Sequence, residues 1–337
     1  MEICEQYYRR VIASIGWTLV IFWGLMQAFG IFVTLLLFVL QELPIDAVFA
    51  DVIYQLTYGA GYLATFMIPV VFLRMLLKKN GCRPQPMRVE PRVSPWLPVI
   101  VFAGLAVCFS AAELNAALVS IFDYSSFSSE VLWGDHAELR GYEVILNFIV
   151  ISIVPGFCEE FLFRGAILEN CLPFGRTNAI VISSLLFAAM HQNIEQFFYT
   201  FVAGIVLGLI YERTGSIWNC TVLHILNNFV SVLQSAVHAK LGNTVEGNLT
   251  LMLIETVIFT LGAVSICILI VRFFSKGSAH RDGVFGKDVP ASDAYALVPI
   301  SSKRAVRLFC HPAMIAFLAL CAVDALTLLM MAVGGYY

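Results

Sequence analysis

The chain has 337 residues, of which 60% are hydrophobic and 13% are charged, and its formal net charge is −3. A soluble domain usually carries about 25% charged residues, so this composition excludes an ordinary soluble enzyme and predicts a chain that crosses a membrane several times. The nine cysteines form neither an even disulfide framework nor the spacing of a metal site. We expect them to behave as small buried hydrophobic residues.

The apolar stretches predict an all-α polytopic transmembrane helical bundle of about eight or nine spans, forming a single multi-spanning domain over residues 1–337. The first stretch follows Arg9 and Arg10 and is far longer than the core of a signal peptide, about 7–15 residues, so we expect it to be a retained span. In chain order the candidates are 11–40, 53–77, 96–120, 141–170, 178–191, 197–211, 216–238, 250–274 and 309–333.

Two of these stretches, 178–191 and 197–211, are short. At 1.5 Å per residue they rise about 20 and 22 Å, which is less than the thickness of the hydrocarbon core. The polar connection at 191–196 should therefore lie below the membrane surface, where non-helical backbone is tolerated only against protein or a water-filled cavity. A water-filled cavity is also what hydrolysis within a membrane requires.

Basic residues gather on one side of the predicted bundle. With the amino terminus inside, every Lys and Arg except Arg140 and Lys240 falls in an inner segment, and the outer loops are acidic. The positive-inside rule therefore places the amino terminus in the cytoplasm of an integral, multi-pass membrane protein. The longest polar interruption, 275–307, is expected to be a loop.

Three polar clusters interrupt the apolar stretches and define the candidate site. An ionisable residue in a membrane span costs about 2.5–3.5 kcal/mol on insertion scales, so by default it marks a functional site. Two carboxylates, two imidazoles and an amide predict a hydrolytic centre in a polar cavity between the fourth, fifth and seventh helices. The clusters read Glu159-Glu160-x-x-x-Arg164, Phe187-x-x-x-His191 and His224-x-x-x-Asn228.

Helix spacing separates the two carboxylates of the first cluster. Glu160 and Arg164 are four residues apart with the acid first, the favoured order for a helical ion pair, and we assign them an orienting role. Glu159 lies about 100° away around the helix and is expected to carry the chemistry as a general base. The alternative is that the cluster anchors the helix at the inner membrane boundary, near Arg164.

The other two clusters also place pairs on one helix face. His224 and Asn228 can donate hydrogen bonds toward one point, as an oxyanion hole requires. Phe187 is expected to pack against His191 and fix its rotamer rather than to contact substrate. Asn227 points about 100° away from these groups and is expected to be a polar packing residue.

In this order, the three motifs resemble the type II CAAX prenyl endopeptidase family, also called the CPBP or Abi intramembrane proteases. Two longer segments also look similar to sequences of this family: Glu159-Glu160-Phe-Leu-Phe-Arg164-Gly165 and Glu212-Arg-Thr-Gly-Ser-Ile-Trp218. The resemblance covers about residues 141–235, the expected catalytic core. It implies an endopeptidase that cleaves near the carboxyl terminus of a membrane-associated or lipidated protein or peptide, from a site open to the cytoplasmic side. The compact chain resembles bacterial relatives, which implies a bacterial plasma membrane.

The resemblance also implies roles for individual residues. Glu159, helped by His191, would activate a water, and His224 with Asn228 would stabilise the tetrahedral oxyanion. We expect no cofactor. Because the family has also been described as metalloproteases, zinc held by Glu159, His191 and His224 is the alternative, but the chain has no His-Glu-x-x-His helix and an amide suits an oxyanion donor better than a metal ligand.

The expected partners are the lipid bilayer and a peptide or lipidated protein substrate, with no nucleic acid, and the sequence leaves the oligomeric state open. Two other classes compete with a protease. A non-catalytic peptide-binding protein, such as a bacteriocin-immunity protein, would use the same cavity. A proton-coupled transporter would explain the further polar residues Glu113, Asn115, Glu255 and Asp324, although the sequence lacks an inverted repeat.

Overall fold

The computed structural model describes residues 2–120, 141–275 and 301–333, and all regular structure in these ranges is helical. Eight helices of this described part are long and apolar enough to cross a membrane, which confirms the predicted all-α polytopic bundle. The expected acidic outer loop at 121–140 and most of the expected polar loop, 276–300, lie outside the described residues. The end of that polar loop forms a short helix, α11 (Ser302–Phe309).

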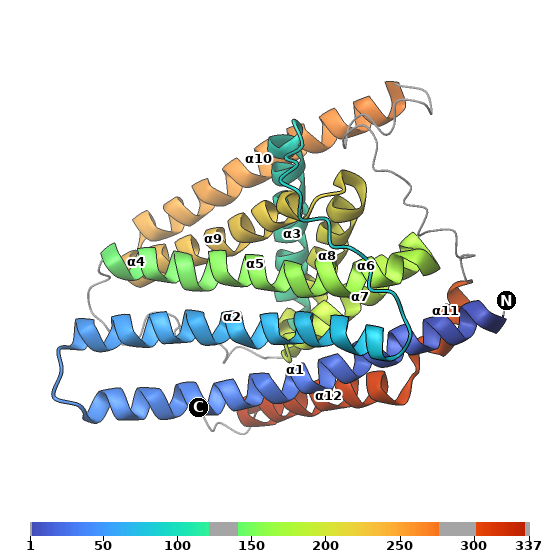
Figure 1. Ribbon diagram of the computed structural model, residues 1–337. Coiled ribbons are helices and arrows are strands. Elements are labelled where there is room, and N and C mark those ends of the chain that lie inside the picture. Colours follow the sequence, from blue (N-terminus) through green and yellow to red (C-terminus); the bar gives the residue numbers. More distant parts are fainter. Residues whose placement is uncertain (1, 121–140, 276–300, 334–337) are drawn as a thin grey trace.

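The first two helices form an antiparallel hairpin along one side of the bundle (Figure 1). They are α1 (Glu2–Glu42) and α2 (Ala47–Lys79). The Asp46 carboxylate caps α2 by accepting hydrogen bonds from the backbone N–H groups of Val48 and Phe49. The last helix, α12 (Pro312–Val333), packs along α1.

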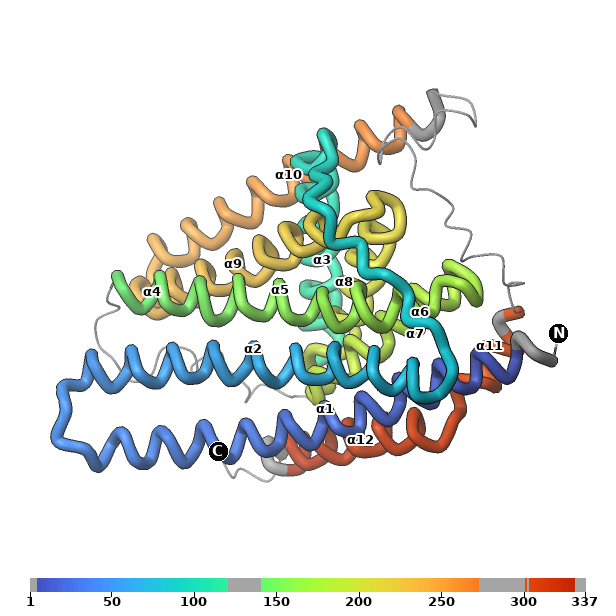
Figure 2. The backbone as a smooth tube through the Cα atoms, viewed as in Figure 1, coloured from blue at the N-terminus to red at the C-terminus, as the bar shows by residue number. Residues whose placement is uncertain are grey.

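The fourth span is one continuous helical rod, residues 141–174 (Figure 2), and its helix type changes along its length. Two π-helical segments flank the short α-helical stretch that carries Glu159 and Glu160. π-Helical turns are rare and are frequently found at functional sites. This local geometry therefore indicates that the rod is part of a functional site. Its segments are α4 (Gly141–Asn147), η2 (Phe148–Ile153), α5 (Val154–Glu160), η3 (Phe161–Leu168), α6 (Glu169–Cys171) and η4 (Leu172–Phe174).

Of the remaining helices, α7, α8 and α9 contact this rod, and α3 and α10 pack against α8 and α9. Their most extensive contacts are those of α9 with the η2–α5 part of the rod, of α7 with α8, and of α3 with both α8 and α10. Their bounds are α3 (Leu97–Ser120), α7 (Arg176–Met190), α8 (Ile194–Thr214), α9 (Ile217–Leu241) and α10 (Val245–Ser275).

One of the two short stretches differs from the sequence prediction. The α7 helix has 15 residues and is short, as expected, but α8 has 21 residues and is long enough to span the membrane. The reason is local, because the Asn193 side chain accepts the backbone N–H of Glu195 and starts the helix three residues earlier than its apolar stretch. The non-helical connection shrinks to 191–193, and Gln192 adopts a left-handed φ of 53° within it.

Two glycines let helices of the site approach each other closely. A Cβ built on Gly156 of α5 would lie 3.1 Å from the backbone nitrogen of Ile225 in α9. A Cβ on Gly204 of α8 would lie 3.0 Å from the Cα of Ser184 in α7. Small residues are a common device for such contacts in membranes, where packing replaces the hydrophobic effect. The first contact brings α5 and α9, and thereby Glu159 and His224, together.

The described helices run between two ends of the bundle that differ in charge. At one end, which we call the basic end, α2, α6, α8 and α10 finish, and their last turns carry Lys78, Lys79, Arg213 and Arg272. The amino terminus and α11 lie at this end in Figure 1, whereas the turn between α1 and α2 lies at the other, which we call the far end. This separation follows the predicted positions of the basic residues.

A segment without regular structure, residues 80–96, crosses the basic end between α2 and α3 in Figure 1, and we call it the strap. The Trp218 indole N–H donates to the carbonyl of Val89 at 2.8 Å, and the backbone N–H of Ile217 donates to the carbonyl of Arg88 at 3.0 Å. The Asn219 side chain donates to the carbonyl of Arg92 and accepts from the backbone N–H of Ser94. The strap is therefore fastened to the first turn of α9.

Candidate active site

The predicted ion pair of the first motif is formed and lies in the interior of the bundle. The Arg164 guanidinium is 2.8 Å from Oε1 of Glu160, and both side chains are fully buried. The same guanidinium donates to the carbonyl of Gly204 at 3.0 Å and lies over the Phe187 ring, 4.6 Å from its centroid. Such burial is incompatible with an anchor at the membrane boundary, and it fixes η3 against α7 and α8.

Glu160 also orients a histidine of the third motif. Its Oε1 lies 2.8 Å from Nδ1 of His224, so the ring is held between α5 and α9. With Nδ1 engaged, Nε2 is the ring nitrogen left for chemistry, and a carboxylate partner of this kind fixes the tautomer and orientation of an imidazole. The Glu160 carboxylate thus links the cation of Arg164 to the imidazole of His224.

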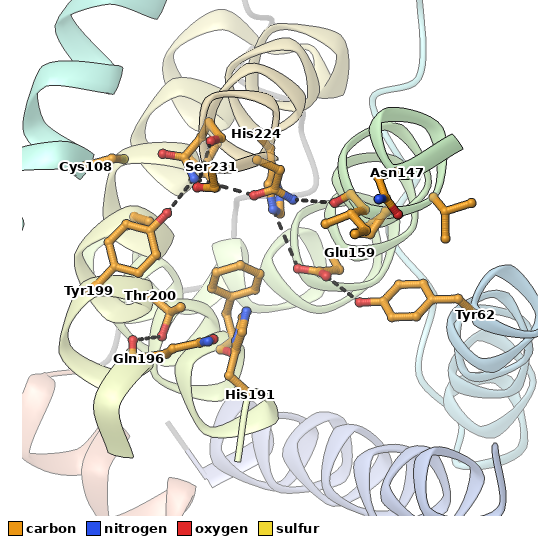
Figure 3. A pocket seen from close by; sticks show the side chains of 18 of the residues that line it. Tyr62, Cys108, Asn147, Glu159, His191, Gln196, Tyr199, Thr200, His224 and Ser231 are labelled. Atoms are coloured by element: carbon orange, nitrogen blue, oxygen red, sulfur yellow. Dashed lines mark hydrogen bonds and ion pairs between the residues drawn. The ribbon is translucent and has the colours of Figure 1, made fainter. Parts of the chain in front are cut away.

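Glu159 lies on the other side of the same imidazole. Its Oε2 is 3.7 Å from Nε2 of His224, too far for a direct hydrogen bond. Its Oε1 accepts the hydroxyl of Tyr62 in α2 at 2.6 Å. Within the described part of the chain, Oε2 is buried without a hydrogen-bonding partner. Figure 3 shows Glu159 between Tyr62 and His224. One carboxylate oxygen is therefore held, and the other remains available next to His224.

His191 reaches the same region from the end of α7. Its Nδ1 lies 2.8 Å from the carbonyl oxygen of Phe187, which again leaves Nε2 as the available nitrogen. The Phe187 ring packs edge-on against His191 and against His224, with ring centroids 4.9 and 5.8 Å apart. These contacts agree with the expected packing role of Phe187, which also faces the cavity described below.

The two adjacent amides of α9 have different partners. The Asn228 side chain donates to the carbonyl of Ile151 in η2 at 3.3 Å. The Asn227 side chain donates to the hydroxyl of Tyr199 in α8. Both residues line the cavity, and Asn227 makes a hydrogen bond between α9 and α8 of the kind expected from a polar packing residue. Contact between α8 and α9 brings Tyr199 to a residue that helix spacing alone directs elsewhere.

A cavity of about 680 Å³ brings most of these groups together. It is lined by Glu159, His191, His224 and Asn228, whereas Glu160 and Arg164 lie behind its wall. The cavity extends beyond the expected fourth, fifth and seventh helices, because α2 and α8 also contribute to its wall. The α2 and α8 residues are Tyr54, Gln55, Tyr58, Tyr62, Gln196, Tyr199, Thr200, Ala203 and Leu207.

The tyrosines of α2 are the part of the wall that the sequence interpretation missed. Tyr54, Tyr58 and Tyr62 follow one another at four-residue spacing, and their rings lie in a row with successive centroids 6.1 Å apart. A stripe of phenols on one face of a membrane helix was a visible signal, because a buried hydroxyl needs a hydrogen-bonding partner. Tyr62 finds that partner in Glu159.

The zinc alternative needs one donor atom from each of Glu159, His191 and His224. In each of them one donor atom is engaged, by Tyr62, by a backbone carbonyl and by Glu160, and the other is free, which is also how the outer contacts of metal ligands are arranged. Among the described residues, no three His, Cys, Asp or Glu side chains are grouped so that they could hold a metal ion.

The polar residues that suggested a transporter lie away from this cavity. Asp324 of α12 accepts hydrogen bonds from the Trp23 indole and from Gln27 of α1. Glu255 of α10 accepts one from Gln234. Glu113 of α3 is exposed, and none of these carboxylates lines the cavity. Their contacts are those of helix packing rather than of a continuous path through the bundle.

Comparison with known proteins identifies relatives of the rod and its neighbours. Residues 141–230 match the family described as "Type II CAAX prenyl endopeptidase Rce1-like". This match confirms the resemblance that the three motifs indicated, for the part of the chain that carries them. No solved structure matches the chain.

Two bacterial proteins are similar to longer parts of the chain. It is 24% identical over 219 residues to the UPF0177 protein YvdC of Lactococcus lactis, an alignment that covers 64% of this chain and 81% of YvdC. It is 29% identical over 143 residues to a Bacillus subtilis protein named "Putative membrane peptidase YdiL", covering 39% of this chain and 57% of YdiL. Together with the eight apolar helices of the described part, these findings support a multi-pass membrane protein whose residues 141–230 are similar to CAAX-type peptidases.

Proposed function

We propose that this chain, whose residues 141–230 match the Rce1-like family of type II CAAX prenyl endopeptidases, is an intramembrane endopeptidase. It hydrolyses a peptide bond near the carboxyl terminus of a membrane-associated or lipidated protein or peptide. The observation that carries the proposal is Glu159, a buried carboxylate with one oxygen held by Tyr62 and the other facing the cavity, 3.7 Å from an oriented imidazole.

In the proposed reaction Glu159 acts as the general base. A water that bridges Oε2 of Glu159 and Nε2 of His224 gives a proton to the carboxylate, and its oxygen attacks the carbonyl carbon of the scissile bond. The C–N bond then breaks as Glu159 returns the proton to the leaving amine, so the products are a carboxylate and an amine. His191, which presents Nε2 to the same cavity, helps to orient the water.

His224 and Asn228 are the proposed donors to the tetrahedral oxyanion. With both ring nitrogens carrying a proton, His224 would donate to Glu160 from Nδ1 and to the oxyanion from Nε2, and Asn228 has a second amide N–H besides the one given to Ile151. Removing one oxyanion donor typically lowers kcat by about 10²–10³-fold.

The Glu159→Gln variant tests the proposal. Peptides from the cell envelope and from the medium are compared by mass spectrometry between cells producing the wild-type chain and cells producing the variant. We expect every fragment that depends on the wild-type chain to be lost in Glu159→Gln, because the amide cannot accept the water's proton. Glu113→Gln is the matched control, since this exposed carboxylate lies outside the cavity, and it should retain the fragments. An unchanged fragment pattern in Glu159→Gln would refute the proposed base.

The metal-free scheme makes a separate prediction. We expect purified active protein to contain well under one zinc ion per chain, and a chelator to change its peptidase rate by less than about twofold. Elemental analysis and a chelator titration measure these quantities. If the protein instead contains near-stoichiometric zinc that is lost in His191→Ala, the water would be activated by zinc rather than by the Glu159 carboxylate alone.

A further inference from the structure

The Asn228 amide, a proposed donor to the oxyanion, is held against a backbone carbonyl of the fourth rod. Its Nδ2 donates to the carbonyl of Ile151 in η2 at 3.3 Å. In an α-helix this carbonyl would accept the N–H of the residue four positions later, but that residue is Pro155, which has no N–H. The proline therefore leaves the Ile151 carbonyl without its α-helical donor, and the Asn228 side chain supplies a donor from α9.

This carbonyl determines which way the Asn228 amide faces. A backbone carbonyl within a helix cannot turn, and only the nitrogen of a side-chain amide can donate to it. With Nδ2 on Ile151, Oδ1 of Asn228 must face the other way, and it lies 3.5 Å from Nδ2 of Asn227. One N–H of Asn228 is thus used by Ile151, and the second is the one proposed to meet the oxyanion.

Asn227 holds the acceptor side of that amide. Its Nδ2 carries two protons and lies beside two acceptors, Oδ1 of Asn228 and the hydroxyl oxygen of Tyr199 in α8. In Figure 3 the Tyr199 hydroxyl points toward the helix that carries His224. A row of hydrogen bonds therefore runs from the Ile151 carbonyl through both amides to Tyr199, and the carbonyl at its start sets the direction of each amide.

Packing of α8 on α9 does not by itself explain this arrangement. An Asn227 amide turned the other way would join the helices equally well, because its Oδ1 could accept the Tyr199 hydroxyl. Among the described residues this Oδ1 instead has no hydrogen-bonding partner, although Asn227 is only 7% exposed. A buried acceptor without a partner is unfavourable and requires an explanation. The turned amide would place two oxygens against each other at Asn228, so the unpaired acceptor follows from presenting an N–H to Asn228.

Resting on the proposed peptidase function, we propose that Asn227 and Tyr199 are positioning residues that fix the amide of Asn228 in the orientation of an oxyanion donor. Without them the Asn228 amide could turn and present Oδ1, which carries partial negative charge, to the developing oxyanion. Neither residue needs to touch the reacting atoms. Because they act through Asn228, they should affect the transition state and not the binding of substrate.

A double-mutant cycle on the full chain tests the proposal. The probe is a quenched fluorescent peptide that spans the cleavage site of a fragment whose release requires Glu159. The kcat and KM values are measured for Asn227→Ala and Tyr199→Phe, each in the wild-type chain and in Asn228→Ala. Effects of residues that act through one group are non-additive, whereas independent effects multiply. Asn219→Ala is the matched control, since Asn219 is a buried amide of the same helix that bonds the strap.

In the wild-type chain we expect Asn227→Ala to lower kcat about tenfold and Tyr199→Phe about threefold, with KM changing less than about twofold. Asn228→Ala should itself lower kcat by about 10²–10³-fold, and in this background both further losses should shrink to less than about twofold, because no amide is left to position. Asn219→Ala should change kcat by the same factor in both backgrounds. Tyr199→Phe keeps the ring, so it still tests the proposal if Asn227→Ala fails to fold.

Equal losses of kcat in both backgrounds overturn the proposal, because the two residues would then act independently of Asn228. A kcat within about twofold of wild type for both variants overturns it too, as does a change confined to KM. If Asn228→Ala keeps the wild-type kcat, there is no oxyanion donor to position and the proposal also fails. In each of these cases cleavage that is lost in Glu159→Gln still supports the peptidase function. If no cleavage depends on Glu159, the peptidase function is refuted and this proposal with it, so the two failures can be told apart.

Discussion

From Glu160 toward the basic end the fourth rod is tightly packed, with residues 162–174 all buried, whereas from Glu159 toward the far end it lines a cavity of about 680 Å³. Adjacent residues of α5 face these two environments. Glu160 binds Arg164 and His224 in the packed half, and Glu159 presents an oxygen to the hollow half. The packed half therefore holds the imidazole of His224 in place, and the hollow half leaves one oxygen of Glu159 free beside it.

The packed half should depend most strongly on its buried cation. Arg164→Ala leaves Glu160 buried without its guanidinium, and removing one partner of a buried pair costs about 3–5 kcal/mol. Thermal unfolding of the detergent-solubilised chain measures the effect. Arg176→Ala is the control, because Arg176 is 69% exposed where it pairs with Glu212, and such surface pairs contribute about 0–1 kcal/mol. Equal melting temperatures for the two variants would contradict the assigned role of Arg164.

The strap should loosen when its amide fastener is removed. Asn219 is 1% exposed and makes two hydrogen bonds to the strap, each contributing about 0.5–1.5 kcal/mol. In Asn219→Ala we expect trypsin to cut after Arg92 at least several times faster than in the wild-type chain. Asn248→Ala, at the far end in α10, is the matched control and should not change the rate. If the strap resists trypsin in Asn219→Ala as well as in the wild-type chain, its other contacts are enough to hold it on α9, and the assigned role of Asn219 is wrong.

The hollow half should respond to loss of a single hydroxyl with a smaller, purely kinetic change. Tyr62→Phe removes the hydrogen bond to Oε1 of Glu159 and keeps the ring in the aromatic row. We expect kcat to fall about tenfold, which corresponds to about 1.4 kcal/mol, with the melting temperature nearly unchanged. Tyr58→Phe removes a hydroxyl that does not bond Glu159 and should change kcat by less than about twofold. If both substitutions lower kcat equally, the loss of kcat comes from a general change in the cavity wall and not from the hydrogen bond to Glu159.

Much of the fold and part of the site could be predicted from local sequence. Apolar length predicts the helices because each span must satisfy its own backbone hydrogen bonds in lipid. The pairing of Glu160 with Arg164 follows from helical spacing alone. Helix α8 was underestimated because Asn193 and Glu195 are polar, although a capping asparagine is itself a signal for a helix start.

Contacts between helices could not be predicted in the same way. The hydrogen bond from Tyr62 to Glu159 joins residues 97 positions apart, and the bond between Asn227 and Tyr199 joins α9 to α8. Sequence spacing directs a side chain around its own helix, but it does not give the tilt of the neighbouring helix. The sequence therefore shows that the tyrosines of α2 share one helix face, but it could not predict that this face lines the cavity.

The sequence by itself determined that this is a membrane bundle, which residues carry charge into it, and which end is basic, because these properties depend on local composition and helical period. Only the tertiary structure decided that Glu159 lines a cavity while Glu160 lies in a packed core. The physical reason is that glycines such as Gly156 set how closely two helices approach, and the gap that remains is a property of several helices together.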